Sequence, residues 1–419
     1  MGQWQFHTPD GVMDILPDDC YAKRQLENQL RDLFWRSGYS EIETPGIEFY
    51  DVYASGTGLA PQEGLFKFFD QQGRILCLRY DGTVPTARVA ATLYRDSQLP
   101  LRFSYINSMY RYNEFGGGRQ REFTQAGIEL MGSQSPAADA EIIAMAIEAA
   151  KTIGIEDLQV SIGQVNFFKG LVDEWGLDDE IAQKLPRLID AKDMVALEEL
   201  ADRIGLSERA REVLLLVPSL YGTYDVLDQL GGLVTSSLCL EALSNLRAVL
   251  DHLDAYGLLE YVSLDLGQLQ SLNYYSGIIF KGFTYGLGFP LFSGGRYDQL
   301  VGNFGRDLSA TGFSIGLNFA LTALRRQNRP LAKRPAVDFL GYHPSRRADA
   351  IGRARQMRQN GWAVVCDYDG KTYDELQSLV RNSDYAAILY LAETGDDLEE
   401  ISAGNETAEG STTGGQTHG

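Results

Sequence analysis

The feature that most constrains the fold is residues 102–132, RFSYINSMYRYNEFGGGRQREFTQAGIELMG. Two runs rich in aromatic and branched residues flank three consecutive glycines at 116–118, which is typical of an antiparallel hairpin with a glycine-rich tip. Because side chains alternate along a strand, the odd-numbered residues from Arg121 to Glu129 share one face of the second strand. We therefore expect a hairpin that displays a row of polar groups on one face.

This polar face has two interpretations. A solvated face of a sheet would carry such groups without any ligand. Alternatively, Gly127 lacks a side chain and opens space between Gln125 and Glu129 for a small molecule. A guanidinium such as that of Arg121 binds a carboxylate or phosphate through two hydrogen bonds, and an amide or carboxylate accepts hydrogen bonds from an ammonium or imidazole N–H. In that case the face suits an amino acid.

The order of the other segments predicts an α+β core followed by a smaller domain. Apolar residues at helical spacing indicate a helix from Pro17 to about Gly38. Near the C-terminus, strands alternate with helices, which indicates a small α/β domain. The predicted division is a core at 1–325 with a mainly helical insertion at about 168–255, a basic linker at 326–334, the α/β domain at 335–395, and a disordered acidic tail at 396–419.

Charge and composition limit the classes of partner and site. The net charge is -20, and an acidic chain is poorly suited to binding a polyphosphate backbone. No apolar run has the length of a membrane span and the N-terminus lacks the order of a signal peptide, so we expect a cytoplasmic protein. No spacing of cysteines or histidines predicts a metal site; these residues are Cys20, Cys77, Cys239, Cys366, His7, His252, His343 and His418.

Several segments, in order, resemble the histidyl-tRNA synthetase group of class II aminoacyl-tRNA synthetases. The hairpin resembles motif 2, R-x-E followed by G-R-x-R-x-F-x-Q, and LRYDGTVPTAR resembles the L-R-P-E-G-T stretch. SLNYYSG resembles R-G-L-D-Y-Y-T-G, SGGRYDQL matches A-G-G-R-Y-D, and GFSIGLN stands where motif 3 belongs. The resemblance covers residues 5 to about 325. It implies a class II core, an antiparallel sheet flanked by helices, that forms a homodimer through motif 1.

The same resemblance implies a binding site for histidine. In the family this site is formed by the motif 2 hairpin together with the other segments quoted above. The implied partners are Asp81, Thr83 and Gln125 for the ammonium group, Glu129 and Tyr275 for the imidazole, Tyr274 for the pocket wall, and Arg111 for the carboxylate or the α-phosphate of an adenylate.

Two departures from that family bear on catalysis. The arginine of R-G-L-D-Y-Y is replaced by Gln270, and the arginine of motif 3, G-L-E-R, is replaced by Phe319. In the family these arginines meet the phosphates of ATP, and losing a single donor of this kind costs about 10²–10³-fold in rate. We therefore expect no adenylation. Arg119 and Arg121 are then either anion contacts or surface charges.

The combination resembles a second family, the histidyl-tRNA synthetase-like regulatory subunits of ATP phosphoribosyltransferase. This resemblance implies a noncatalytic subunit in the first step of histidine biosynthesis. Such a subunit is required for activity of a short catalytic subunit and for feedback inhibition by histidine. It also implies a homodimer within a hetero-octamer, histidine as ligand, no cofactor and no tRNA.

Two other functions stay open from the sequence alone. A divergent ligase would activate histidine or a related amino acid with ATP, although Gln270 and Phe319 argue against it. An amino-acid sensor with a different partner would use the same pocket. In a further interpretation, the pocket no longer binds a ligand, and its polar groups form hydrogen bonds only with one another.

Overall fold

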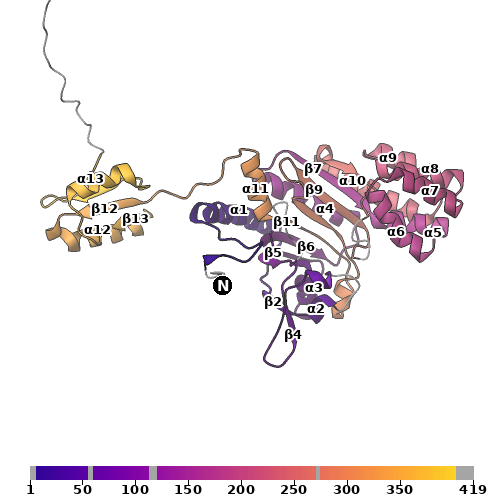
Figure 1. Ribbon diagram of the computed structural model, residues 1–419, viewed down its shortest axis with the longest axis horizontal. Coiled ribbons are helices and arrows are strands. Elements are labelled where there is room, and N and C mark those ends of the chain that lie inside the picture. Colours follow the sequence, from indigo (N-terminus) through magenta and orange to yellow (C-terminus); the bar gives the residue numbers. More distant parts are fainter. Residues whose placement is uncertain (1–5, 55–59, 113–119, 270–273, 403–419) are drawn as a thin grey trace, which may run out of the picture. The chain divides into compact units, whose positions relative to one another are not determined.

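The computed structural model describes residues 6–54, 60–112, 120–269 and 274–402. The chain forms two compact units, Met1–Ala332 and Lys333–Gly419 (Figure 1). Among the described residues, no helix is both long enough and apolar enough to cross a membrane. Each unit has its own sheet and its own buried core.

The first unit is built on an eight-stranded sheet in the order β1-β5-β6-β11-β10-β9-β7-β8. The central pairs are antiparallel, and the two edge pairs, β1–β5 and β7–β8, are parallel. The expected antiparallel sheet flanked by helices is therefore confirmed. The strands are β1 (Ser40–Glu41), β5 (Leu101–Tyr110), β6 (Glu122–Met131), β7 (Leu158–Gln164), β8 (Val262–Leu264), β9 (Ile278–Thr284), β10 (Phe292–Arg296) and β11 (Ala310–Gly316).

Strands β5 and β6 form the hairpin that the sequence predicts. Their register runs from Leu101 opposite Met131 to Tyr110 opposite Glu122, and the glycine-rich tip lies outside the described residues. The alternation along β6 separates two environments. Even-numbered residues such as Ile128 belong to the main apolar core, whereas the odd-numbered residues lie on the other face of the sheet.

Helices cover the even-numbered face. They are α1 (Pro17–Arg36), α4 (Pro136–Thr152) and α11 (Leu317–Arg326), and Figure 1 shows them against the sheet. Helix α1 begins at Pro17 with Asp18 and Asp19 in its first turn, where acidic side chains favour the positive end of the helix dipole. Gly38, at φ +80°, adopts the left-handed conformation just after the helix ends.

The odd-numbered face carries a small sheet in the order β2-β4-β3 and two helices. Antiparallel pairing holds this small sheet together. Helix α3 follows directly on the segment that contains Asp81. These elements are β2 (Ile47–Phe49), β3 (Lys67–Phe69), β4 (Ile75–Leu78), α2 (Asp51–Ala54) and α3 (Thr83–Thr92).

A helical insertion lies between β7 and β8. Side chains cap several of its helices; Asp178, for example, accepts a hydrogen bond from the backbone N–H of Ile181 at 2.8 Å. Leucine-rich faces of these helices continue the main core. The helices are α5 (Val165–Trp175), α6 (Asp179–Asp190), α7 (Met194–Ile204), α8 (Glu208–Leu216), α9 (Tyr224–Gly231) and α10 (Ser237–Ala255).

The second unit is a small α/β domain with the strand order β13-β12-β14-β15. Its last strand, β15, lies in the segment expected to be a disordered tail from residue 396. That expectation is wrong for residues 398–400, because β15 pairs with β14 and Ile401 is buried. The elements are β12 (Asp338–Tyr342), α12 (Arg347–Gln359), β13 (Val364–Cys366), α13 (Tyr373–Asn382), β14 (Ile388–Leu391) and β15 (Leu398–Glu400).

Candidate functional site

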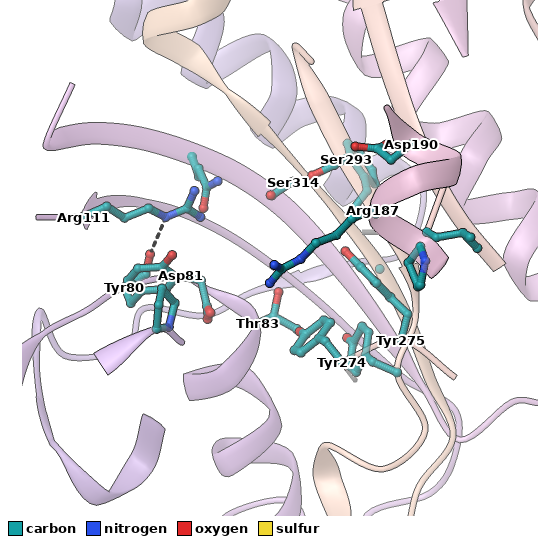
Figure 2. Close-up of a pocket in the computed structure, with 18 of the residues that line it drawn as sticks. Tyr80, Asp81, Thr83, Arg111, Arg187, Asp190, Tyr274, Tyr275, Ser293 and Ser314 are labelled. Carbon is teal, nitrogen blue, oxygen red and sulfur yellow. Dashed lines mark hydrogen bonds between the residues drawn. The ribbon is translucent and has the colours of Figure 1, made fainter. Parts of the chain in front are cut away.

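A cavity of about 800 Å³ opens on the odd-numbered face of the large sheet. Its walls come from β6, β10 and β11, from the segment before α3, and from helix α6 of the insertion. The structure therefore brings together segments that are far apart in the chain. The residues predicted to bind histidine that line this cavity are Asp81, Thr83, Arg111, Gln125, Tyr274 and Tyr275 (Figure 2).

The remaining predicted residue, Glu129, lies behind the cavity wall. Its side chain is fully buried and accepts hydrogen bonds from the hydroxyl groups of Tyr105, at 3.4 Å, and Tyr297. A Cβ atom at Gly312 would lie 1.8 Å from Glu129 Oε2, so only glycine allows the carboxyl group this position. Because Tyr297 and Gly312 line the cavity, Glu129 supports the wall that a ligand would touch.

Burial raises the pKa of both carboxyl groups. The pKa of Asp81 rises to about 6, although the N–H of Val84 at 2.9 Å and the charge of Arg111 act against burial. The pKa of Glu129 rises to about 8, because burial outweighs its hydrogen bonds to Tyr297 and Thr83. At pH 7 Asp81 is therefore mainly ionised and Glu129 is mainly protonated, so the two groups have different charges.

Gln125 presents an acceptor without a partner. The residue is 8% exposed, and its Oε1 atom has no hydrogen-bond partner among the described residues. A buried polar atom of this kind costs free energy unless a ligand or water satisfies it. Together, the amide oxygen of Gln125 and the carboxylate of Asp81 offer the acceptors that an ammonium group needs.

Gly127 has a different role from the one expected. A Cβ atom there would lie 2.5 Å from the hydroxyl oxygen of Tyr105 and 2.7 Å from the carbonyl oxygen of Phe313. The space above this glycine is thus filled by the Tyr105 ring and by the neighbouring strand, not by the cavity. Gly127 allows Tyr105 to reach Glu129 beneath the wall.

Arg111 and Arg121, on either side of the hairpin tip, have separate surroundings. Arg111 lines the cavity, donates from Nε to the carbonyl oxygen of Tyr80 at 3.3 Å, and lies over the rings of Tyr80 and Phe123 (Figure 2). Arg121 does not line it, because its side chain packs on Gly11 and its Nη1 atom donates to the carbonyl oxygen of Asp10 at 3.2 Å. The structure therefore brings Arg111 and not Arg121 to the cavity.

Phe319 stands where the resembling synthetases carry the motif 3 arginine. Its ring stacks on Phe123 with centroids 5.7 Å apart and planes at 20°, and it meets the edge of Phe289 at 4.7 Å. The neighbouring Asn318 accepts a hydrogen bond from the backbone N–H of Thr124 at 3.0 Å. Aromatic side chains therefore pack around the start of helix α11, where Phe319 lies. The other two positions considered, Arg119 and Gln270, lie outside the described residues.

The Gly294-Gly295-Arg296 segment serves packing at the cavity. A Cβ atom at Gly294 would lie 2.3 Å from the carbonyl oxygen of Gly312, and one at Gly295 would lie 2.8 Å from the Tyr275 ring. Arg296 forms a buried ion pair with Asp139 at 3.0 Å. The segment therefore positions Tyr275 and joins the sheet to helix α4.

Comparisons with known proteins agree with this geometry. A family model described as histidyl-tRNA synthetase matches residues 11–319. A protein of Acetivibrio thermocellus named ATP phosphoribosyltransferase regulatory subunit is 50% identical over 375 residues, covering 89% of this chain and 90% of that protein. One of the same name from Ruminiclostridium cellulolyticum is 45% identical over 392 residues, 93% of each chain. The chain belongs to the family of ATP phosphoribosyltransferase regulatory subunits.

Solved structures confirm the shared fold. A Bacillus halodurans protein described as ATP phosphoribosyltransferase regulatory subunit/histidyl-tRNA synthetase superposes with a TM-score of 0.83 at 33% identity, covering 94% of this chain and all of that one. The histidyl-tRNA synthetase of Nostoc superposes with a TM-score of 0.77 at 22% identity, over 92% of this chain and 91% of the other. The family resemblance drawn from the sequence motifs is confirmed.

In this member of the regulatory-subunit family, sequence reasoning missed one wall of the cavity. Helix α6 contributes Gln183, Pro186, Arg187 and Asp190. The sequence DEIAQKLPRLID reads as an ordinary amphipathic helix, and its one unusual feature is a proline inside it. Nothing in that pattern indicates that the insertion folds over the site, because contacts between distant segments leave no local signal.

Proposed function

We propose that this chain is the regulatory subunit of an ATP phosphoribosyltransferase and that it binds histidine in the cavity without catalysing a reaction of its own. The identities of 50% and 45% to proteins named as such regulatory subunits support the assignment. The partner would be a short catalytic subunit that joins ATP to phosphoribosyl pyrophosphate, in a cytoplasmic hetero-octamer. The regulatory chain would be required both for that activity and for its inhibition by histidine.

The observation that carries the ligand assignment is the pair of acceptors at the cavity wall. Asp81 is mainly ionised at pH 7, and Gln125 has an unsatisfied amide oxygen among the described residues. An amino acid brings an ammonium group to these acceptors, and Tyr274 and Tyr275 offer ring surface to an imidazole. We infer histidine as the ligand, with no cofactor.

The absence of catalysis is supported by the surroundings of Phe319. Its ring is held between Phe123 and Phe289, so this position offers aromatic packing and no positive charge. Activation of an amino acid with ATP needs cations aimed at the phosphates. Inhibition would arise instead as a coupling free energy between histidine in this cavity and the active site of the partner.

Two measurements test the proposal. Calorimetric titration of the full chain with L-histidine should show binding that needs no ATP. Mixing the chain with a short-form catalytic subunit should give phosphoribosyl transfer that neither chain shows alone and that histidine inhibits. ATP–pyrophosphate exchange dependent on histidine would contradict the proposal and favour a ligase.

A further inference from the structure

We propose that Arg187, on helix α6 of the helical insertion, binds the carboxylate of the amino acid held in the cavity. This role rests on the proposed histidine site. It would make the bound ligand a direct link between the insertion and the sheet.

Among the described residues that line the cavity, the positively charged side chains are Arg111 and Arg187. Arg111 is already engaged, because it donates to the carbonyl oxygen of Tyr80 and lies 4.7 Å from the centre of that ring. Its charge also lowers the pKa of Asp81, so the two groups attract one another on the same side of the cavity. Arg111 is therefore partly neutralised before any ligand arrives.

Arg187 has no such partner. Among the residues that the structure describes, its guanidinium forms no hydrogen bond or ion pair. Figure 2 shows the side chain reaching from α6 across the cavity toward Thr83. A guanidinium presented in this way can form two parallel hydrogen bonds to a carboxylate.

The polarity of the cavity sets the orientation of an amino acid. Its ammonium group is drawn to Asp81 and Gln125, as argued above. The ligand's carboxylate is repelled by Asp81, and it is attracted by the guanidinium of Arg187, which has no ion-pair partner among the described residues. An α-amino acid is a class of ligand that carries both of these charges.

Helix α6 also carries a carboxylate one turn from this arginine, at Asp190. The carboxylates of Asp190, on the same helix, and Asp265 lie near the ammonium group of Lys281 on β9, where they oppose the lowering of its pKa by burial. Asp190 also lines the cavity. A carboxylate held by Arg187 would add a second attachment between α6 and the core, one turn away from the first. Binding of the ligand would thus steady the insertion.

The test compares two ligands that differ in the carboxylate. L-Histidine and histamine are titrated into the full-length wild-type chain and into the Arg187→Gln and Arg203→Gln variants. Arg203 is an exposed arginine on α7 that does not line the cavity, so it controls for loss of a charge from the insertion. We expect Arg187→Gln to weaken histidine binding by about 10- to 100-fold, the range for a charge-assisted hydrogen bond. Histamine binding should stay unchanged, and Arg203→Gln should behave as wild type.

The possible results separate this inference from the proposed function. Wild-type chain that binds no histidine would overturn the proposed site itself. Wild-type chain that binds histidine, together with an Arg187→Gln variant that keeps full preference for histidine over histamine, would overturn only the role of Arg187. Equal weakening of both ligands would show that Arg187 shapes the cavity and would also overturn its role in binding the carboxylate.

Discussion

Two neighbouring regions of the hairpin face differ sharply in character. Beside Asp81, the polar residues Gln125 and Glu129 are buried, and the amide oxygen of Gln125 has no hydrogen-bond partner among the described residues. Around Phe319, the position of a synthetase arginine is filled by stacked rings. The first region offers acceptors that suit an ammonium group, and the second carries an aromatic ring at the position where the resembling synthetases carry an arginine. If the proposed histidine site is right, one half of a synthetase-like site serves binding in this chain while the other half serves packing.

The largest expected effect comes from Gly312→Ala in the polar region. The added Cβ would meet Glu129 Oε2 at 1.8 Å and the carbonyl oxygen of Ile128 at 2.6 Å, so the buried carboxyl group must move. We expect a loss of about 3 kcal/mol in the free energy of unfolding, measured with urea, and loss of histidine binding. Gly288→Ala, with no atom within 4 Å of its Cβ, is the matched control. Equal stability of the two variants would show that the wall around Glu129 is not tightly packed.

Asp81→Asn removes the charge of the polar region and keeps its shape. We expect histidine to bind about 10- to 100-fold more weakly by calorimetry, because the ammonium group loses a charge-assisted hydrogen bond. Asp96→Asn, at an exposed residue away from the cavity, should leave the affinity unchanged. Unaltered binding to Asp81→Asn would mean that the ammonium group lies elsewhere.

The substitution Phe319→Arg places a positive charge in the aromatic region, at the position where the resembling synthetases carry an arginine. We expect about 2 kcal/mol lower stability, because the ring loses its stacking on Phe123 and its T-shaped contact with Phe289. Histidine-dependent ATP–pyrophosphate exchange should remain absent. Tyr285→Arg, at a ring that is 69% exposed, controls for replacing an aromatic residue by arginine. Exchange activity in Phe319→Arg would show that this single position separates the chain from a ligase.

The last expected effect concerns pH. The pKa of Glu129 is raised by burial from 4.5 to about 8, so the folded chain holds this proton more tightly than the unfolded chain does. The stability that the proton contributes is complete below pH 4.5 and is lost as the pH rises toward about 8. Glu129→Gln has no such proton. Wild type should therefore lose stability relative to Glu129→Gln steadily from pH 5 to pH 8. A difference in unfolding free energy that stays constant over this range would contradict the raised pKa.

Local patterns were sufficient to predict most of the fold. The hairpin, the helix at Pro17, and the strand-to-helix turn before Phe319 each carry a periodicity or a turn residue that their own sequence displays. The motifs in order then identified the wall formed by Asp81, Gln125 and Tyr275. Strand alternation fixes which side chains of the hairpin share a face, whereas Asp81 and Tyr275 came from the order of the motifs, and the binding of a ligand by these residues stays a prediction.

The parts that sequence reasoning missed depend on contacts between distant segments. Helix α6 reaches the cavity from an insertion, and the ring of Tyr105 fills the space above Gly127. Arg121 packs against the segment at Gly11, more than a hundred positions away along the chain. Strand β15 was missed because the acidic composition of this segment indicated disorder. Its apolar residues Leu398 and Ile401 nevertheless pack with the apolar clusters of the second unit. In each case the decisive partner lies far from the residue it controls.

The parallel pairing of β7 and β8 limits which helices of the insertion can be deleted. Parallel neighbours cannot be joined by a tight turn, so the connection between them must travel back along the sheet. Helix α10 packs along α4 and α5 on this return path and leads directly to the segment before β8. Shortened chains that omit α6 through α9 while keeping α10 would retain the crossover, whereas excision of the whole insertion would leave the sheet without its edge strand.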